Sequence, residues 1–591
     1  MTIAQGQEPD ADRGGMGGGL VPGLFPAPES MRPTLMGDRW AVVGGHPLVS
    51  QVAAEVLAAG GNAVDAGVAA GLASNVVQVD MASFGGIAPI LVRSARDGRV
   101  HSVAGVGRWG ASATLEAVRD RYGDSLPLGG APCIVPGAPA AWIAALRNFG
   151  TWSFADAAAP AIELAESGFP LDHRTADNLR VMGAGFSQWA SSRSVYWPQG
   201  RPPLPGERLR QPDLAALLRL LGDAESAAAG GRDAGLAAAY EAFYRGPVAE
   251  RIASFVTEHG GFLDAQDLAR YQAEVAPAPS VRFAGWDVAV TSGWSQGTVV
   301  AQALAILDGA DLARDGYGSF AHLHPLVEAL KLAFSDRELY LGDPDAGGAS
   351  FDWLTGAERI EQLRALLGDS ALPYAPSAGL AGPRLGSTTA VVVADADGNL
   401  FSTSPSDTLD GGPIIDGLGI LCSPRGVQSR LVAGHPNVVA PGKRPCVTPA
   451  AVIAERGGPD GSNGSDGELL ALACPGGDVI VQALAQVFVN LEVFGMRPQE
   501  AVEAARFAAF NFPSGFHPHP SAEGLLLVED RIDASVRSAL AAAGHEVQVW
   551  PGFEFDAGSV QVVRSEPAPD GTGRVLTAGA DPRRSAYAIT R

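Results

Sequence analysis

The sequence predicts a mixed α+β fold, and two observations predict it. Short apolar segments rich in Val, such as Trp40 to Val43 and Val391 to Val393, have the length and β-branched composition of buried strands. Between them, residues 137–330 are mainly helical, because Ala and Leu recur at spacings of three and four. The 591 residues are enough for a large core or for several domains.

The elements can be predicted in order along the chain. Residues 1–37 are polar and glycine-rich and are predicted to be a disordered leader. A helix follows from Pro47 to Ala59, and Asn62 and Asp65 open a second helix whose many Ala residues indicate close packing. Ala224 to Gly235 has low complexity and is predicted to be an exposed loop.

Composition excludes several classes of function. A net charge of −22 argues against nucleic acid or an anionic membrane as a partner. No apolar run is long enough for a membrane span, and no signal peptide precedes the leader, so a cytoplasmic location is expected. The four cysteines are scattered without metal-site spacing, and the chain has no phosphate-binding loop or convincing dinucleotide motif. We therefore expect no metal and no cofactor.

The segment from Gly386 to Asn399 carries the candidate chemistry. Two Thr residues precede three Val residues of a strand, and Asp397-Gly398-Asn399 forms the turn to a returning strand. A long Gly, Pro and Ala-rich stretch precedes Thr388 and is predicted to be an exposed loop. A backbone cut before Thr388 would free an α-amine that titrates near ~8 and can accept the proton of its own hydroxyl.

An ordered set of short motifs extends over nearly the whole chain and resembles the γ-glutamyltranspeptidase family of N-terminal-nucleophile (Ntn) hydrolases. In the first part, these motifs are His46-Pro47-Leu48-Val49-Ser50, Gly60-Gly61-Asn62-Ala63-Val64-Asp65-Ala66, Asn75-Val76-Val77, Phe84-Gly85-Gly86, Val135-Pro136-Gly137 and Pro160 to Glu166. After the Thr388 hairpin come Gly417 to Leu421, His435-Pro436-Asn437, Pro441 to Pro445, Pro475-Gly476-Gly477 and Ala580 to Arg583.

The resemblance implies an αββα four-layer sandwich made as a precursor that cuts itself between Ser387 and Thr388. The large piece would span residues 38–387 and the small piece residues 388–591, and the two would stay associated, with a dimer of such heterodimers possible. Thr388 would be the nucleophile, and Ser406 would take the place of a second Thr that contacts its amine. The N–H groups of Gly476 and Gly477 would hold the oxyanion.

Departures from the family pattern bear on the substrate. Arg108 occupies the place of the family's arginine that binds the substrate α-carboxylate. The run Ser423 to Val427 contains Arg425 where the transpeptidases have an acidic residue for the substrate amine. A γ-glutamyl donor should therefore bind poorly, and Arg425 is assigned to substrate binding as in the acylase-like branch. We expect a bacterial enzyme that hydrolyses an amide of a small, carboxylate-bearing substrate.

Four alternatives remain open. Gly293-Trp294-Ser295-Gln296-Gly297 has the G-x-S-x-G pattern in a strand-turn-helix context, so Ser295 could be the nucleophile of a serine hydrolase, with Asp407 or Asp416 and one of His435, His517 or His545 completing the triad. The chain could also be an authentic γ-glutamyl transferase or glutathione hydrolase, or an atypical relative from antibiotic biosynthesis that cleaves a carbon–carbon bond next to a carbonyl. It could lastly be an uncut, non-catalytic binding protein.

Overall fold

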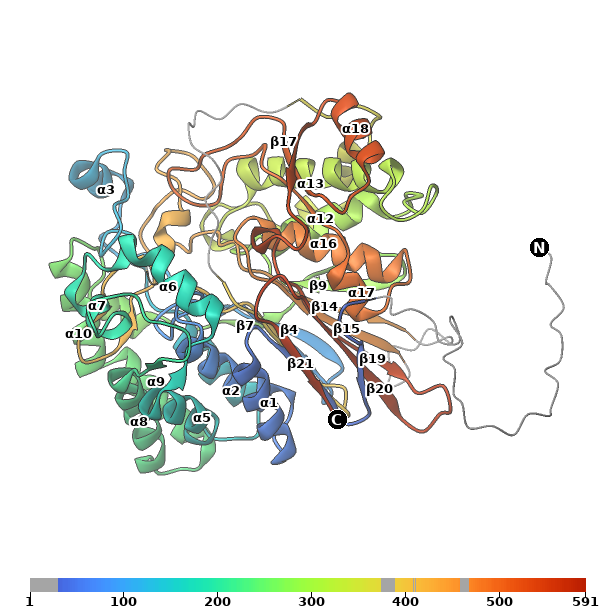
Figure 1. Cartoon of the computed structure of the whole chain (residues 1–591). Helices are drawn as coiled ribbons and strands as arrows, with labels where there is room; N and C mark the ends of the chain where they lie inside the picture. The colour runs from blue at the N-terminus through green and yellow to red at the C-terminus, as the bar shows by residue number, and fades with distance from the viewer. Residues whose placement is uncertain (1–29, 374–387, 408, 410, 458–466) are drawn as a thin grey trace, which may run out of the picture.

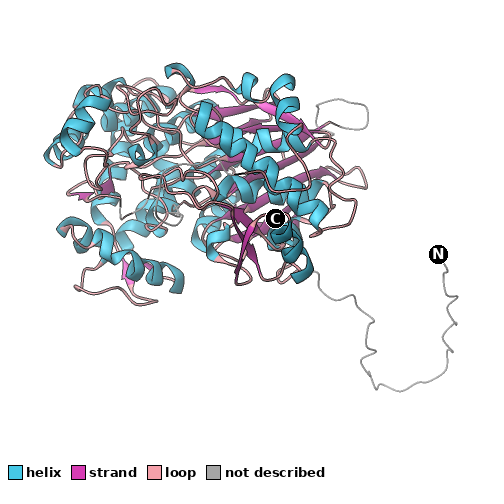
Figure 2. Cartoon of the chain, turned by 90° about the horizontal axis from the view of Figure 1, so that it is seen from above, coloured by secondary structure: helices cyan, strands magenta, loops and turns pink. Residues whose placement is uncertain are grey.

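Two seven-stranded sheets lie face to face, and helices cover the outer side of each (Figures 1 and 2). The structure is a computed structural model that describes residues 30–373, 388–407, 409, 411–457 and 467–591. The four layers are helix, sheet, sheet and helix, as predicted.

The first sheet contains the Thr388 hairpin and is antiparallel throughout. Val391 pairs with Thr403 across the hairpin, and Gly398 occupies the turn with a φ of +87°, a conformation that favours glycine. In spatial order the strands are β21 (Tyr587–Thr590), β2 (Trp40–Gly44), β10 (Val391–Asp395), β11 (Leu400–Thr403), β3 (Ile90–Ser94), β4 (Arg99–Val103) and β7 (Val275–Pro277).

The second sheet is also antiparallel and combines both ends of the chain. Its strands in spatial order are β1 (Leu35–Gly37), β20 (Arg574–Ala580), β19 (Gln561–Pro567), β15 (Glu468–Ala473), β14 (Ala451–Arg456), β9 (Trp286–Val290) and β8 (Ser280–Phe283).

The side chains of β10 point alternately into two cores, and these cores hold the layers together. Val391 and Val393 pack into the core shared with the helices, whereas Val392 and Ala394 pack into the core between the sheets. Successive side chains of a strand point to opposite faces, so a strand buried on both faces is apolar throughout. The core between the sheets consists largely of Ala, Val and Leu residues.

The helices on the first sheet begin with α1 (Pro47–Ala58) and α2 (Ala63–Val77). Asn62 caps α2, its side chain accepting from the N–H of Asp65, whose side chain accepts from the N–H of Asn62 in return. A Cβ on Gly67 would lie 2.2 Å from the Phe401 ring, which confirms that this helix packs closely. The other helices of this half are α3 (Leu115–Tyr122), α4 (Ala138–Phe149), α5 (Phe154–Ser167), α6 (His173–Phe186), α7 (Ala190–Tyr196), α8 (Pro212–Ala227), α9 (Arg232–Tyr244), α10 (Pro247–Glu258) and α11 (Ala265–Arg270).

The outer face of the second sheet is covered mainly by α12 (Gly297–Leu307), α13 (Phe320–Tyr340) and α16 (Val479–Glu492), which lie above it in Figure 1. Shorter helices on this side are α14 (Phe351–Leu354), α15 (Ala357–Arg364), α17 (Pro498–Glu503) and α18 (Ala534–Ala542). Small sheets pair β5 (Phe169–Pro170) with β6 (Arg208–Leu209), β12 (Ile414–Ile415) with β13 (Ile420–Leu421), and β16 (Phe507–Ala509), β17 (Leu525–Glu529) and β18 (Glu546–Trp550).

Two predicted segments differ from the structure. The predicted leader extends to residue 37, but Leu35–Gly37 forms β1 and pairs with β20, because the edge of the second sheet offers backbone partners. The predicted loop from Ala224 to Gly235 is mostly helical, since α8 continues to Ala227 and α9 starts at Arg232. Alanine favours helix, so low complexity was a poor indicator of a loop.

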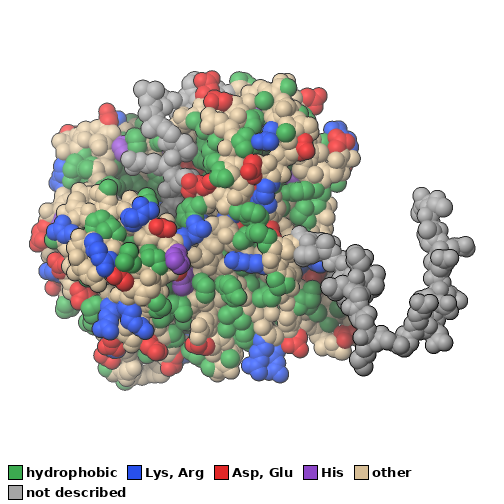
Figure 3. All heavy atoms as spheres, in the orientation of Figure 1, with side chains coloured by type: hydrophobic (Ala, Val, Ile, Leu, Met, Phe, Trp, Pro, Cys, Tyr) green, Lys and Arg blue, Asp and Glu red, His purple; other side chains and the backbone are tan. Residues whose placement is uncertain are grey.

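Two further observations concern the described residues only. None of the helices there is both long and apolar enough to cross a membrane. Acidic and basic side chains are scattered over the face shown in Figure 3.

Candidate active site

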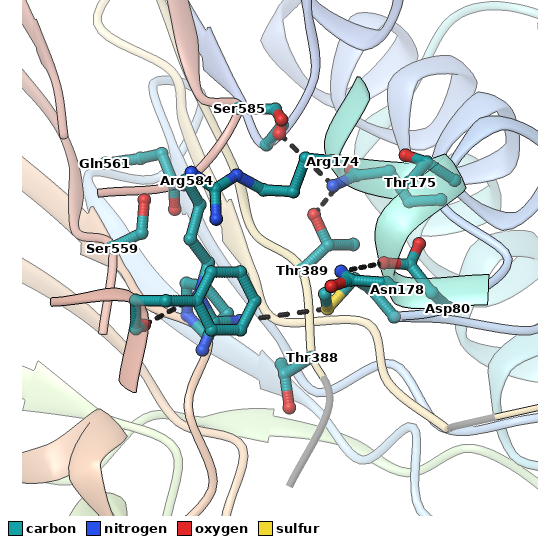
Figure 4. A pocket seen from close by; sticks show the side chains of 15 residues that line it. Asp80, Arg174, Thr175, Asn178, Thr388, Thr389, Ser559, Gln561, Arg584 and Ser585 are labelled. Atoms are coloured by element: carbon teal, nitrogen blue, oxygen red, sulfur yellow. Dashed lines mark hydrogen bonds between the residues drawn. The ribbon is translucent and has the colours of Figure 1, made fainter. Parts of the chain in front are cut away.

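Thr388 lies three residues before the first-sheet strand β10, and its side chain is buried. Its Oγ1 lies 2.9 Å from the Oγ of Ser406, and the two residues form an isolated antiparallel bridge. Thr389 points the opposite way and donates from its hydroxyl to Oε1 of Gln78 at 2.6 Å. Figure 4 shows these opposed directions, which follow from strand alternation. The structure therefore brings together Thr388 and Ser406, as predicted.

A buried ionic network lies behind Ser406. Arg425 donates from Nη2 to the Ser406 hydroxyl and from Nε to Oδ1 of Asp407. The Ser423 hydroxyl donates to the other carboxylate oxygen of Asp407 at 2.6 Å. Burial raises the pKa of the Asp407 carboxyl, whereas the Arg425 charge opposes that rise. Arg425 therefore contacts Ser406, which in turn contacts Thr388. Its predicted contact with the substrate stays a prediction.

Asp407 also has an unusual backbone. Its φ of +133° lies in a region that residues with a Cβ rarely adopt. The residue is 1% exposed and is held by Arg425 and Ser423. Strain of this kind persists only where surrounding contacts determine the conformation, and it concentrates at functional sites.

Gly476 and Gly477 form the turn between β15 and α16. Their φ values are +138° and +61°, so both adopt backbone conformations that favour glycine. The carbonyls of both glycines accept hydrogen bonds from the first turn of α16, from the N–H groups of Val479 and Ile480. Pro475, which precedes them, lines the same pocket as Thr388. Their predicted role as oxyanion donors remains a prediction.

Arg108 is engaged by an acidic cluster. Its guanidinium donates to Glu274 at 3.0 Å, Asp345 at 3.2 Å and Asp343 at 3.3 Å, and to the Gly442 carbonyl at 3.0 Å. These carboxylates raise the pKa of Arg108, although burial acts against them. Arg108 is absent from the lining of the pocket at Thr388. Its assignment to a substrate carboxylate is therefore untested, and any substrate would compete with three protein carboxylates.

A small pocket, with a volume of about 20 Å³, lies beside Thr388 and Thr389 (Figure 4). Burial raises the pKa of Asp80 in this pocket to about 6, and Asn178 donates to Oδ2 of Asp80 at 2.6 Å. The lining residues that could contact a polar ligand are Gln78, Asp80, Arg174, Asn178, Gln561, Arg584 and Ser585.

Sequence reasoning missed most of these lining residues. Arg584 directly follows the Asp581-Pro582-Arg583 motif, and Gln78 directly follows Asn75-Val76-Val77, so the adjoining motifs were the available signal. Asp80, Arg174 and Gln561 come from distant segments that only the folded chain brings together.

Ser295 lies in the strand-turn-helix structure that its G-x-S-x-G pattern predicts, but its contacts are not those of a catalytic nucleophile. The strand β9, the turn and the helix α12 are present as predicted. The Ser295 hydroxyl is fully buried, donates to the Pro449 carbonyl at 2.8 Å and lies 2.9 Å from Oγ1 of Thr291. Among the described residues no histidine is hydrogen-bonded to it. The contacts of Ser295 do not support a serine hydrolase.

Asp407 and the histidines proposed for the Ser295 triad have other partners. Asp407 pairs with Arg425 and Ser423. His435 contacts Glu338 at 3.3 Å, and His545 contacts His324 at 3.0 Å. The His517 ring lies beside the His519 ring, with centroids 5.6 Å apart. Among the described residues, none of the three histidines is hydrogen-bonded to Ser295 as the general base that the hypothesis requires.

One group of possible metal ligands occurs within the described ranges, formed by His324, Glu328 and His545. Lys331 donates to Oε1 of Glu328 at 2.8 Å, and His324 contacts the Gly368 carbonyl through Nε2 at 3.0 Å. A divalent cation here would meet the Lys331 charge in a buried site, which is costly. These contacts instead attach residues 368–372 to α13.

The fold and this arrangement define a class of protein. A threonine at the start of a core strand, hydrogen-bonded to a second hydroxyl and placed next to a glycine turn in an αββα sandwich, is the arrangement of an Ntn hydrolase. Residues 49–590 match the family model described as Gamma-glutamyltranspeptidase. The chain belongs to the γ-glutamyltranspeptidase family, and it is a hydrolase or acyltransferase of that family.

Individual relatives agree with this assignment. The chain is 32% identical to the Acylase ACY 1 proenzyme of Pseudomonas sp. (strain V22) over 91% of each chain. It is 30% identical to the Glutathione hydrolase-like YwrD proenzyme of Bacillus subtilis (strain 168), covering 95% of this chain and 100% of the relative. The crystal structure of cephalosporin acylase from Bacillus halodurans is 29% identical, with a TM-score of 0.82, over 97% of this chain and 99% of that one.

Proposed function

We propose that this chain is a self-processing amidohydrolase in which Thr388 is the nucleophile. The observation that carries the proposal is the buried contact of Thr388 Oγ1 with Ser406, held by Arg425, at the edge of a polar pocket. That similar proteins are described as proenzymes supports cleavage of this chain also.

In the self-cleavage step, Thr388 Oγ1 attacks the carbonyl carbon of Ser387. Ser387 lies outside the described residues, so this step is inferred from chemistry. The new C–O bond replaces the C–N bond between the two residues, and the hydroxyl proton passes to the departing amine. Water then hydrolyses the ester, which leaves a carboxylate on Ser387 and restores the Thr388 hydroxyl.

The pieces 38–387 and 388–591 would remain together because each sheet contains strands of both. In the first sheet, β10 and β11 of the small piece lie between β2 and β3 of the large piece. In the second sheet, the small piece supplies the four central strands β20, β19, β15 and β14. Separation would expose the apolar core between the sheets, which is unfavourable. Further association into a dimer of heterodimers belongs to the same proposal.

During turnover, the free α-amine of Thr388 would take the hydroxyl proton as the oxygen attacks the substrate carbonyl. Gly476 and Gly477 would stabilise the oxyanion, each donor contributing about 3 kcal/mol to the transition state. Ser406 would orient the nucleophile. The substrate is a small molecule bearing a carboxylate, the reaction is hydrolysis of its amide, and the setting is the bacterial cytoplasm.

Authentic γ-glutamyl transfer is less favoured because Arg425 stands where an acidic partner for the substrate amine would be required, and Arg425 is occupied by Asp407 and Ser406. Cleavage of a carbon–carbon bond next to a carbonyl uses the same nucleophile and stays an alternative. A non-catalytic role would leave the Thr388–Ser406–Arg425 network without a purpose.

Intact-mass spectrometry of the purified full chain tests the proposal, with Thr388→Ala as the control. We expect two fragments that divide between Ser387 and Thr388 in the parent protein and one full-length mass in the variant. A single full-length mass for both proteins, together with no release of amine from any carboxylate-bearing amide, would contradict the proposed function.

A further inference from the structure

The pocket beside Thr389 contains a buried carboxamide that has no hydrogen-bond partner in the described part of the chain. Gln561 is 1% exposed, and neither Nε2 nor Oε1 is hydrogen-bonded to any described residue. It is the first residue of β19 and lies opposite Ala473 and Ala580 on the two flanking strands. Those strands lead directly into the Gly476 turn and the Arg584 turn. Buried amides are normally hydrogen-bonded, so this one calls for an explanation.

Two other polar groups in the pocket are also poorly satisfied. Oδ1 of Asp80 has no partner among the described residues. Arg584, 8% exposed, donates to the Phe555 carbonyl at 3.3 Å and to the sulfur of Met81 at 3.7 Å, which is a weak acceptor. A guanidinium carries five N–H donors, so Arg584 retains unused donors for a ligand.

Two arginines of the pocket lie near the predicted oxyanion site. The guanidinium groups of Arg584 and Arg174 both lie against the Phe555 ring, at 4.0 Å and 5.1 Å from its centre. Nη2 of Arg584 is 3.7 Å from the position that a Cβ would occupy on Gly476. Figure 4 shows Arg584, Gln561 and Ser559 on the same side of the pocket. An anionic group bound there would lie next to the glycine turn.

We propose that this pocket is the subsite that binds the substrate carboxylate, an inference that rests on the proposed function. Arg584 donates to the carboxylate, and the Gln561 carboxamide bonds to a polar group of the same fragment. Charge-assisted pairs with arginine are among the stronger hydrogen bonds, and Arg108 is already occupied by three protein carboxylates. Asp80 lies opposite, and because burial raises its pKa to about 6, its carboxyl becomes protonated and can donate a hydrogen bond only below about pH 6.

Gln561→Leu provides a sharp test because it removes no hydrogen bond within the described protein. Thr577→Val is the matched control. Thr577 Oγ1 is also buried without a partner among the residues described, and it lies on the adjacent strand β20, away from the pocket lining. Arg584→Gln and Arg108→Gln compare the two candidate arginines. Each change is made in the self-cleaved protein, so that the pocket is tested in the form proposed to bind substrate.

The probes are monoanilides of four- to six-carbon dicarboxylic acids and acetylated aminobenzoates, each paired with its uncharged carboxamide. The first set carries the carboxylate on the acyl part and the second on the leaving amine, so the two sets distinguish which part enters the pocket. Binding is followed by titration calorimetry and by ligand-detected NMR. Circular dichroism and a thermal melt establish that each variant is folded.

We expect one probe set to bind better than its uncharged counterpart. Arg584→Gln should reduce that preference at least tenfold, Gln561→Leu should weaken binding several-fold without lowering thermal stability, and Thr577→Val should change nothing. Loss of the preference in Arg108→Gln but not in Arg584→Gln, or no binding of any charged probe, would overturn the subsite.

Failure of the subsite and failure of the proposed function give different results. A chain that cuts itself and hydrolyses amides without dependence on Arg584 overturns only the subsite. A chain that binds carboxylates through Arg584 but neither cuts itself nor hydrolyses an amide supports the subsite and overturns the enzyme.

Discussion

The two sides of the Thr388–Thr389 pair differ in how their polar groups are satisfied. On the Thr388 side, Ser406, Arg425 and Asp407 bond to one another. On the Thr389 side, Gln561 and Oδ1 of Asp80 have no hydrogen-bond partner among the described residues, and Arg584 makes only two long contacts, to the Phe555 carbonyl and the Met81 sulfur. A fully paired network can hold a reacting group in place, whereas unpaired buried groups are available to a ligand. We therefore infer that the Thr388 side positions the nucleophile and that the Thr389 side binds the substrate.

The paired side should be the more sensitive to mutation. Arg425→Gln leaves the buried Asp407 carboxylate without its cation, and breaking a buried pair in this way costs about 3–5 kcal/mol. Urea unfolding followed by circular dichroism would measure this loss. A loss below about 1 kcal/mol would mean that the network does not hold the site together.

On the unpaired side, a substitution is expected to raise the free energy of unfolding instead of lowering it. Burial raises the pKa of Asp80 to about 6 in the folded protein, from an ordinary value of 3.8, so its ionisation disfavours the folded state. The contribution of Asp80 to the free energy of unfolding should be most favourable below about pH 4 and fall as the pH rises through about 6. Asp80→Asn should therefore stabilise the protein by up to about 3 kcal/mol at pH 8, since each pKa unit corresponds to about 1.4 kcal/mol.

The measurement is a series of denaturant titrations from pH 4 to pH 8 on the parent protein and Asp80→Asn. The two curves should converge at the acid end. A difference that is constant with pH would show that Asp80 does not titrate as proposed.

Ser406→Ala tests positioning of the nucleophile. It removes the hydroxyl 2.9 Å from Thr388 Oγ1, and self-cleavage should slow by about ten- to a hundredfold, or about 1.4–2.8 kcal/mol in the barrier. The rate is followed on gels after synthesis of the precursor in vitro. Ser404→Ala is the matched control, because Ser404 donates to the Ala450 carbonyl instead and should leave the rate unchanged.

Arg108→Gln should have the smallest effect on stability. Its side chain is 27% exposed, and Arg444 also pairs with Glu274, Asp343 and Asp345. A loss of about 1 kcal/mol or less is expected in the same unfolding assay. A loss as large as that of Arg425→Gln would remove the distinction between the two arginines.

Local sequence was sufficient to predict features that depend on neighbouring residues. Three such features occur as predicted: the hairpin at Gly398, the helix start at Asn62 and Asp65, and the strand-turn-helix around Ser295. Features that depend on distant partners were not predictable. The partners of Arg108 and the pocket formed by Asp80, Arg174 and Gln561 depend on which segments the fold brings together, and no local pattern encodes this.

The central claim is that Thr388 carries the acyl group during turnover. The most direct measurement is to mix the purified, self-cleaved protein with a reactive carboxylate-bearing anilide, quench with acid, and locate the added mass by peptide mapping. We predict an acyl group on the N-terminal Thr388 of the small fragment and none in Thr388→Ala. An acyl group on Ser295, or on any residue other than Thr388, would contradict the account.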